Sequence, residues 1–247
     1  MDRLIHTALS SLRGAMARQS VTANNLANVA TPGFRAEVSS AQARWVNGPG
    51  YQARAVALQG VMGADMGAGT VAQTGRDMDI AIVGDALLTV QDGDGNEAYT
   101  RRGDLQLSPS GLLTTGDGHP VMGDQGPITV PPADSMRIDA DGSLWVVPRG
   151  GDPDAPQRID RLKLASPGGS QIEKGLDTLF HVPGGGVLPS DPAARLATGQ
   201  LEQSNVNATQ ALVAMIEAAR GYETQMRLIS TAQNLDQAGA DLMRLPE

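Results

Sequence analysis

The chain contains no cysteine and few aromatic residues. Its 247 residues include two Trp, three Tyr and two Phe, so aromatics make up 3% of the sequence. Without cysteine, the chain can form no disulfide framework, no thiolate nucleophile and no cysteine-ligated metal site. With so few aromatic rings, apolar burial must come from Leu, Val, Ile, Met and Ala, which favours close contacts between small side chains.

The sequence also lacks an excess of basic residues and any long apolar run. A net charge of -8 argues against nucleic-acid binding, which needs clustered Lys and Arg. No stretch approaches the roughly 20 apolar residues that cross a bilayer, so we expect no membrane insertion. Residues 1–20 contain Arg3, Arg13 and Arg18 and no continuous apolar segment, so we expect no cleaved signal peptide. Their similarity to an organellar transit peptide would not explain the features below.

Both ends of the chain carry the heptad pattern of a coiled coil, in which apolar or small residues recur at alternating steps of four and three. We therefore expect two long helices that pair with each other, the second capped at its start by Asn205 or Asn207. The two seams are Ile5, Leu9, Leu12, Met16, Gln19, Ala23, Leu26 and Ala30, and Ala208, Leu212, Met215, Ala219, Tyr222, Met226 and Ile229.

Each predicted helix also has apolar residues beside its seam. A helix that is apolar on its flanks as well as along its seam needs more than one neighbour to bury that surface. The flanking residues are Ala8, Ala15, Ala17, Val21, Ala27 and Val29 in the first helix, and Val213, Ile216, Ala218 and Leu228 in the second.

The first helical pattern ends in neutral amides rather than charges. Asn24, Asn25 and Asn28 precede Thr31-Pro32-Gly33-Phe34, although asparagine is a poor helix former because its amide competes for backbone groups. Proline at the second position and glycine at the third predict a type II turn. An ordinary asparagine-rich helix end before a loop is the alternative interpretation of the amides.

The middle of the chain changes period. Residues 76–180 consist of short apolar runs separated by Asp-Gly, Pro and Ser-Gly turns, which predicts an all-β domain. Asp141-Gly142 predicts a hairpin within it. The overall prediction is an α+β fold: residues 1–35 and 200–247 form the helical coiled-coil domain, and 76–180 the β domain. The remaining ranges, 36–75 and 181–199, are rich in Gly, Ala and Pro and are predicted to be extended linkers.

No motif in the sequence predicts catalysis. The stretch 92–97 (DGDGNE) resembles a calcium loop, but Glu97 replaces the required glycine and Gly103 the required glutamate, so hairpin turns explain it better. Arg102-Gly103-Asp104 spells a cell-adhesion tripeptide, but it lies in a strand-like run. The histidines show no ligand spacing, and no nucleophile elbow, P-loop or dinucleotide motif is present. We expect no enzyme, cofactor, metal or small-molecule substrate. The three histidines are His6, His119 and His181.

Three stretches together resemble the axial proteins of the bacterial flagellum, which form its rod, hook and hook–filament junction. ANNLANVATPGFRA (23–36) resembles their N-terminal signature, GRDMDIAIVGDALLTVQ (75–91) the opening of their β domain, and the run from 196 to 231 their C-terminal helix. The length and the RLKLASP stretch (161–167) favour the shorter, proximal rod paralogue. The sequence departs from the usual Gly-Asp-Gly-aromatic pattern at 84–87, which reads Gly-Asp-Ala-Leu.

This resemblance implies a structural subunit of the basal-body rod, a periplasm-spanning shaft. It implies that the terminal helices line the tube and polymerise with copies of the chain and other rod proteins. It also implies export by the flagellar type III apparatus, for which 36–50 is the region where we expect a cue. In such a wall the asparagine amides could bond across helices and fix their register. Isolated terminal helices are marginal, so we expect them to be largely disordered before incorporation.

The expected assembly interface combines seam residues and asparagines with the turn residues Pro32, Gly33 and Phe34. Two alternatives stay open: a distal rod or hook paralogue of the same family, and a β-rich binding module that dimerises through its coiled coil. The interface residues are Ile5, Leu9, Leu12, Met16, Ala23, Asn24, Asn25, Leu26, Asn28, Leu212, Met215, Ala219, Tyr222, Met226 and Ile229.

Overall fold

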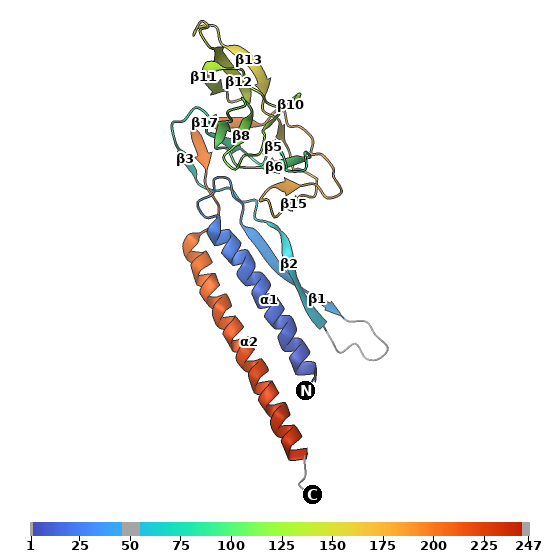
Figure 1. Ribbon diagram of the computed structural model, residues 1–247. Coiled ribbons are helices and arrows are strands. Elements are labelled where there is room, and N and C mark those ends of the chain that lie inside the picture. Colours follow the sequence, from blue (N-terminus) through green and yellow to red (C-terminus); the bar gives the residue numbers. More distant parts are fainter. Residues whose placement is uncertain (1, 46–54, 244–247) are drawn as a thin grey trace. The chain divides into compact units, whose positions relative to one another are not determined.

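The computed structural model describes residues 2–45 and 55–243 (Figure 1). The chain is mixed α and β, with an N-terminal helix, a β-rich centre and a C-terminal helix, which confirms the predicted order of elements. The chain forms two compact units. The helical unit comprises residues 1–27, 37–63 and 207–247, and the β unit comprises 28–36 and 64–206.

The helical unit contains two helices and a pair of strands. Helices α1 (Asp2–Ala27) and α2 (Ala208–Met243) lie against each other, as Figure 1 shows in blue and red. Strands β1 (Glu37–Trp45) and β2 (Ala55–Ala64) pair as a two-stranded sheet, and β1 contacts α1. Helix α1 therefore contacts both α2 and the β1 strand.

The β unit is built from short strands joined by tight turns. Its largest sheet has five strands in the order β14-β5-β6-β16-β15, and a three-stranded sheet has the order β11-β12-β13. Two-stranded pairs β17-β4, β18-β3, β7-β8 and β10-β9 complete it. The strands are β3 (Val71–Gln73), β4 (Ile80–Val83), β5 (Leu87–Gln91), β6 (Glu97–Thr100), β7 (Leu105–Leu107), β8 (Leu113–Thr115), β9 (Met122–Gly123), β10 (Gly126–Pro127), β11 (Ala133–Ile138), β12 (Ser143–Pro148), β13 (Gln157–Arg161), β14 (Leu164–Ala165), β15 (Glu173–Lys174), β16 (Phe180–His181), β17 (Arg195–Thr198) and β18 (Gln200–Glu202).

The core of the β unit is mainly aliphatic, as the composition predicts. A large cluster of buried Leu, Ile, Val and Ala side chains includes Ile80, Leu88, Leu113 and Leu144. A smaller cluster surrounds Tyr99, whose buried hydroxyl accepts a hydrogen bond from the backbone N–H of Leu188 at 2.7 Å. A buried phenol needs such a partner, so this contact fixes the segment around Leu188 against the sheet.

The predicted hairpins form at the Asp-Gly sequences. Strands β11 and β12 pair antiparallel around Gly142, which has a φ of 86°. The stretch 92–97, which resembles a calcium loop, joins the antiparallel strands β5 and β6. In that turn Asp92 accepts hydrogen bonds from the backbone N–H groups of Asp94 and Asn96. These carboxylate bonds close the turn in the manner of an Asx motif.

The ranges predicted as linkers contain paired strands. Residues 36–75 hold β1, β2 and β3, while 181–199 hold the end of β16 and all of β17. Strand β3 pairs with β18 and β4 with β17, so segments on either side of the predicted β domain complete each other. Glycine and alanine weaken strand propensity only modestly, and pairing with a distant partner satisfies their backbone groups. The β unit consequently extends beyond the predicted range 76–180.

Candidate assembly interface

Helix α1 keeps part of its predicted seam exposed within the single chain. Met16 is 55% exposed, and Leu9 and Ala23 are also exposed, whereas Ala15 and Val21 on the flank are buried. Leu12 and Leu26 are half-buried. The row Leu9, Met16 and Ala23 is therefore available to a partner, while a neighbouring row is buried inside the chain. The side chain of Ile5 lies outside the described residues.

Helix α2 shows the same offset. Ala211, outside the predicted seam, is buried. Of the seam residues, Met215, Tyr222 and Ile229 are half-buried, whereas Leu212, Ala219 and Met226 are exposed. The helix has 36 residues against 26 in α1, so it carries more apolar surface than α1 alone can cover. Further exposed apolar side chains on α2 are Val213, Ile216, Leu228 and Leu235.

Asn207 caps the start of α2. Its side-chain Oδ1 accepts a hydrogen bond from the backbone N–H of Gln210 at 3.1 Å, which satisfies one of the donors that the first turn leaves unpaired. Of the two predicted caps, Asn207 is the one used. Asn205 instead bonds within the β unit: its Oδ1 accepts the N–H of Ala36, and its Nδ2 donates to the carbonyl oxygens of Asp65 and Gly67.

The asparagines at the end of α1 are engaged inside the chain. Asn25 donates to the carbonyl oxygen of Glu37 at 2.9 Å and accepts its N–H at 2.8 Å, so one amide pairs with the first backbone position of β1 as a strand residue would. Asn24 donates to the Glu37 carboxylate. In the β unit, Asn28 accepts a hydrogen bond from the hydroxyl of Thr31. These hydrogen bonds lie within one chain, so the expected bonds across a subunit interface stay a prediction.

Residues 31–34 form a tight turn that needs glycine. Phe34 donates its N–H to the carbonyl oxygen of Thr31, and Gly33 has a φ of 67°, the features of a type II turn. A Cβ at Gly33 would lie 2.3 Å from the backbone of Arg101, so any other residue would force the two segments apart. Phe34 is buried, with Lys174 Nζ 3.4 Å from its ring centre.

Two arginines share one glutamate beside this turn. Glu202 Oε1 lies 2.6 Å from Arg35 Nη1, and Glu202 Oε2 accepts hydrogen bonds from Arg101 Nε and Nη2 at 3.0 and 2.6 Å. We call Arg35, Arg101 and Glu202 the arginine–glutamate triad. Burial opposes ionisation of Glu202, but the Arg101 charge and hydrogen bonds, the Gly69 N–H and the Arg35 charge outweigh it and lower the pKa of the carboxyl.

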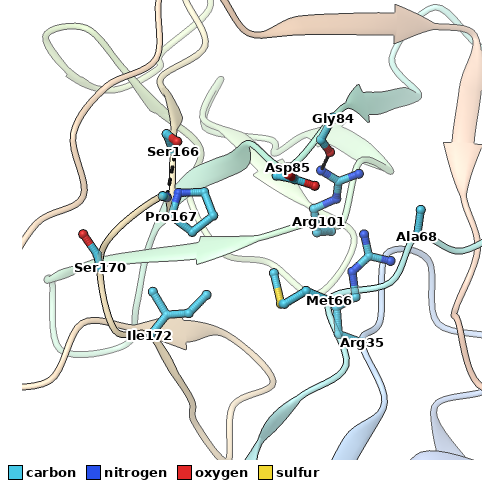
Figure 2. Close-up of a pocket in the computed structure, with 11 residues that line it drawn as sticks. Arg35, Met66, Ala68, Gly84, Asp85, Arg101, Ser166, Pro167, Ser170 and Ile172 are labelled. Carbon is cyan, nitrogen blue, oxygen red and sulfur yellow. Dashed lines mark hydrogen bonds between the residues drawn. The ribbon is translucent and has the colours of Figure 1, made fainter.

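The triad joins segments that are distant in sequence. The backbone carbonyl of Glu202 accepts the N–H of Gly33 at 2.7 Å, and its carboxylate accepts the N–H of Gly69 at 2.9 Å. Arg101 also donates to the carbonyl oxygens of Ile82, Gly84 and Ala86; Figure 2 shows the bond to Gly84. Neither periodicity nor motif predicted this triad, because isolated charged residues give no sign of their distant partners.

The Arg-Gly-Asp tripeptide of the sequence forms an ion pair within itself. Arg102 pairs with both carboxylate oxygens of Asp104 at 2.6 and 2.8 Å, so the tripeptide's two charges neutralise each other. Within residues 2–45 and 55–243 no group of three or more His, Cys, Asp or Glu is arranged to hold a metal ion. Across the same residues no helix is long and apolar enough to cross a membrane.

Three family models match the chain in order. Residues 5–35 match the flagella basal body rod protein family, 81–146 the D1 domain of the flagellar hook protein FlgE/F/G family, and 197–242 the C-terminal part of the flagellar basal body rod FlgEFG proteins. These matches cover nearly all of α1 with its turn, the strands from β4 to β12, and most of α2 with the strands just before it. The combination of these elements defines a structural axial protein of the flagellum.

Relatives along nearly the whole chain narrow this class. The flagellar basal-body rod protein FlgF of Escherichia coli K12 is 40% identical over 97% of this chain and 96% of its own length. FlgF of Salmonella typhimurium LT2 is 40% identical over 94% of each chain. FlgG of Bacillus subtilis 168 is 28% identical over 99% of this chain and 100% of its own. The chain belongs to the FlgF family of flagellar basal-body rod proteins, which confirms the predicted proximal rod paralogue.

Proposed function

We propose that this chain is a structural subunit of the flagellar basal-body rod that polymerises through its terminal helices and transmits torque from motor to hook. Its partners are copies of itself and other rod proteins, and it is not an enzyme. The observation that carries the proposal is the apolar surface left on both helices of a FlgF-family chain, including Met16, Leu212 and Met226. Burying that surface is the main free-energy gain available to assembly.

The two helices pair as a coiled coil in this proposal, and their outward rows contact neighbouring subunits. Contacts between different surfaces of identical copies produce an open helix when the rotation does not close, which suits a shaft. Export by the type III apparatus to a periplasm-spanning position, without cleavage, completes the proposal. The proposed export region 36–50 lies only partly within the described residues.

Deletion of the gene followed by electron microscopy of purified basal bodies tests this function. We expect the deletion strain to lack the shaft and hook and to be non-motile, with both restored by a plasmid copy. A complete rod and normal swimming in the deletion strain would contradict the proposal. The rival binding module predicts instead a closed dimer in solution that is absent from purified basal bodies.

A further inference from the structure

The β unit contains a pocket of about 470 Å³ beside the arginine–glutamate triad (Figure 2). Arg35 and Arg101 line one part of it, and the side chains of Met66, Pro167 and Ile172 supply apolar walls. The serines Ser166 and Ser170 add hydroxyl groups to the lining. A cationic region next to apolar walls is suited to a ligand with one anionic end and a short apolar stem.

Two nitrogen atoms of the Arg35 guanidinium have no hydrogen-bond acceptor among the described residues. The residue is 2% exposed, yet neither Nε nor Nη1 donates a hydrogen bond to any described residue. Nη1 lies close enough to Glu202 to form an ion pair, but its hydrogens are not aligned for a bond. Arg101, in contrast, is bonded to Glu202 and to backbone carbonyls. Buried arginine N–H groups are normally paired, and a carboxylate matches two of them at once.

The charges around the pocket point to an anionic ligand. Among the described residues, Arg35 and Arg101 share the buried carboxylate of Glu202, so the triad carries one net positive charge. Asp85 also lines the pocket, and its negative charge acts on Arg101, but its side chain is exposed. Solvent screens an exposed carboxylate strongly, so Asp85 compensates Arg35 only weakly.

We propose that this pocket binds an acidic side chain, Glu or Asp, presented by a second copy of this chain. Charge complementarity supports that occupant, because a second copy carries 27 acidic against 19 basic residues and a net charge of -8. The carboxylate pairs with Arg35, and the methylene stem contacts Met66, Pro167 and Ile172. The proposal rests on the polymerising function above, to which it adds a contact made by the β unit. It is a heterologous contact, since the acidic side chain and the pocket are different surfaces.

A glutamate placed in the pocket from the same chain tests the proposal without disturbing the triad. Met66 is exposed and lines the pocket, so Met66→Glu supplies the missing carboxylate, and Met66→Gln is the matched control of equal shape. We expect Met66→Glu in the full chain to melt roughly 3 °C or more above Met66→Gln. The new carboxylate should also block the pocket against a neighbouring subunit. In basal bodies purified from complemented deletion strains, we therefore expect the amount of the Met66→Glu protein to be roughly tenfold lower than that of Met66→Gln.

Sodium acetate tests the pocket with a free carboxylate. At equal ionic strength, acetate should raise the melting temperature of the wild-type chain above its value in sodium chloride, and Asp85→Asn should enlarge this difference. Equal melting of the two Met66 variants would overturn the site. If the two Met66 variants melt at different temperatures but are incorporated into basal bodies in equal amounts, a second copy is not the source of the carboxylate. If the deletion strain lacks the shaft but the two Met66 variants melt at the same temperature, the rod function is supported and the pocket proposal is refuted.

Discussion

At the scale of single residues, Glu202 is the group on which the charged interior of the β unit depends. It is 2% exposed, and within the described part of the chain both buried arginines contact its carboxylate. Its backbone carbonyl and carboxylate also hold Gly33 and Gly69. Removing one partner of a buried ion pair leaves the others uncompensated, which costs far more than losing a surface pair.

We predict that Glu202→Gln lowers the free energy of unfolding at pH 7 by about 3 kcal/mol. Because the folded-state pKa of Glu202 lies below its ordinary value of 4.5, its ionisation stabilises the fold fully above that pH. This stabilisation is lost as the pH falls from 4.5 through the lowered pKa. Urea unfolding between pH 3 and pH 7 should show a smaller acid-side loss in the variant than in the wild type.

Glu97→Gln is the control, since Glu97 pairs with Lys163 where both side chains are partly exposed. It should cost no more than about 1 kcal/mol. An equal loss of stability in the two variants would show that burial does not distinguish these ion pairs.

Thr178 holds an unusual backbone conformation. Its φ is 68°, the one positive φ of a non-glycine residue among the described residues, and a β-branched side chain is strained there. It ends a turn in which its N–H donates to Gly175. We predict that Thr178→Gly stabilises the protein by about 1 kcal/mol, because glycine adopts positive φ without a Cβ clash.

Thermal unfolding followed by calorimetry measures this gain. Thr198→Gly, in strand β17 with its antiparallel partner Ile80, should lose about 0.5–1 kcal/mol from the entropy of glycine in a strand. A fall in melting temperature for both variants would show that the conformation at 178 is not strained.

At the scale of elements, α2 separates folding from assembly. Met226 lies on the predicted seam but is exposed in the single chain, so changing it should leave the subunit intact. We predict that Met226→Asp preserves the circular dichroism of the purified chain but abolishes rod formation and motility. The charge would be buried without a partner in the assembled wall. Swarming assays and microscopy of basal bodies measure the outcome.

Arg227→Asp provides the matched control, because the next residue is rotated by about 100° around the helix and is also exposed. We expect it to retain motility. Loss of motility in both variants would indicate a general effect of negative charge on α2 rather than a specific apolar contact at Met226.

The sequence was informative where the signal is local. Heptad steps predicted both helices, Asn207 was one of two proposed caps, and Asp-Gly pairs predicted the hairpins at 92–97 and 141–142. It could not determine which of two adjacent rows faces inward, since Ala211 and Leu212 both continue an apolar pattern. It also missed the pairing of β3 with β18 and the arginine–glutamate triad. These contacts join residues far apart in the chain, and neither composition nor local pattern indicates which distant residues will pair.

At the scale of the whole molecule, the chain passes between the two units at residues 27–28, 36–37, 63–64 and 206–207. On the β-unit side, the segments next to these crossings are hydrogen-bonded to one another. Gly33 bonds to Glu202, Asp65 to the carbonyl of Ala36, and the N–H of Asn205 to the carbonyl of Phe34. A force applied through any crossing therefore reaches the same bonded group of segments, which suits a subunit that transmits torque.

This division into units predicts unequal stability in the free subunit. The β unit has buried aliphatic clusters of its own, whereas α1 and α2 leave apolar rows exposed that only further neighbours can cover. We predict that in dilute solution the amides of α1 and α2 exchange through local openings whose free energy is at most about 1 kcal/mol. For the amides of β5 and β6, the free energy of opening should approach that of global unfolding. Hydrogen exchange followed by mass spectrometry compares both units in one sample, so the β strands serve as the internal control. Strong protection of both helices in a monodisperse monomer would mean that one chain already covers these surfaces, and the helices would then have no free-energy reason to polymerise.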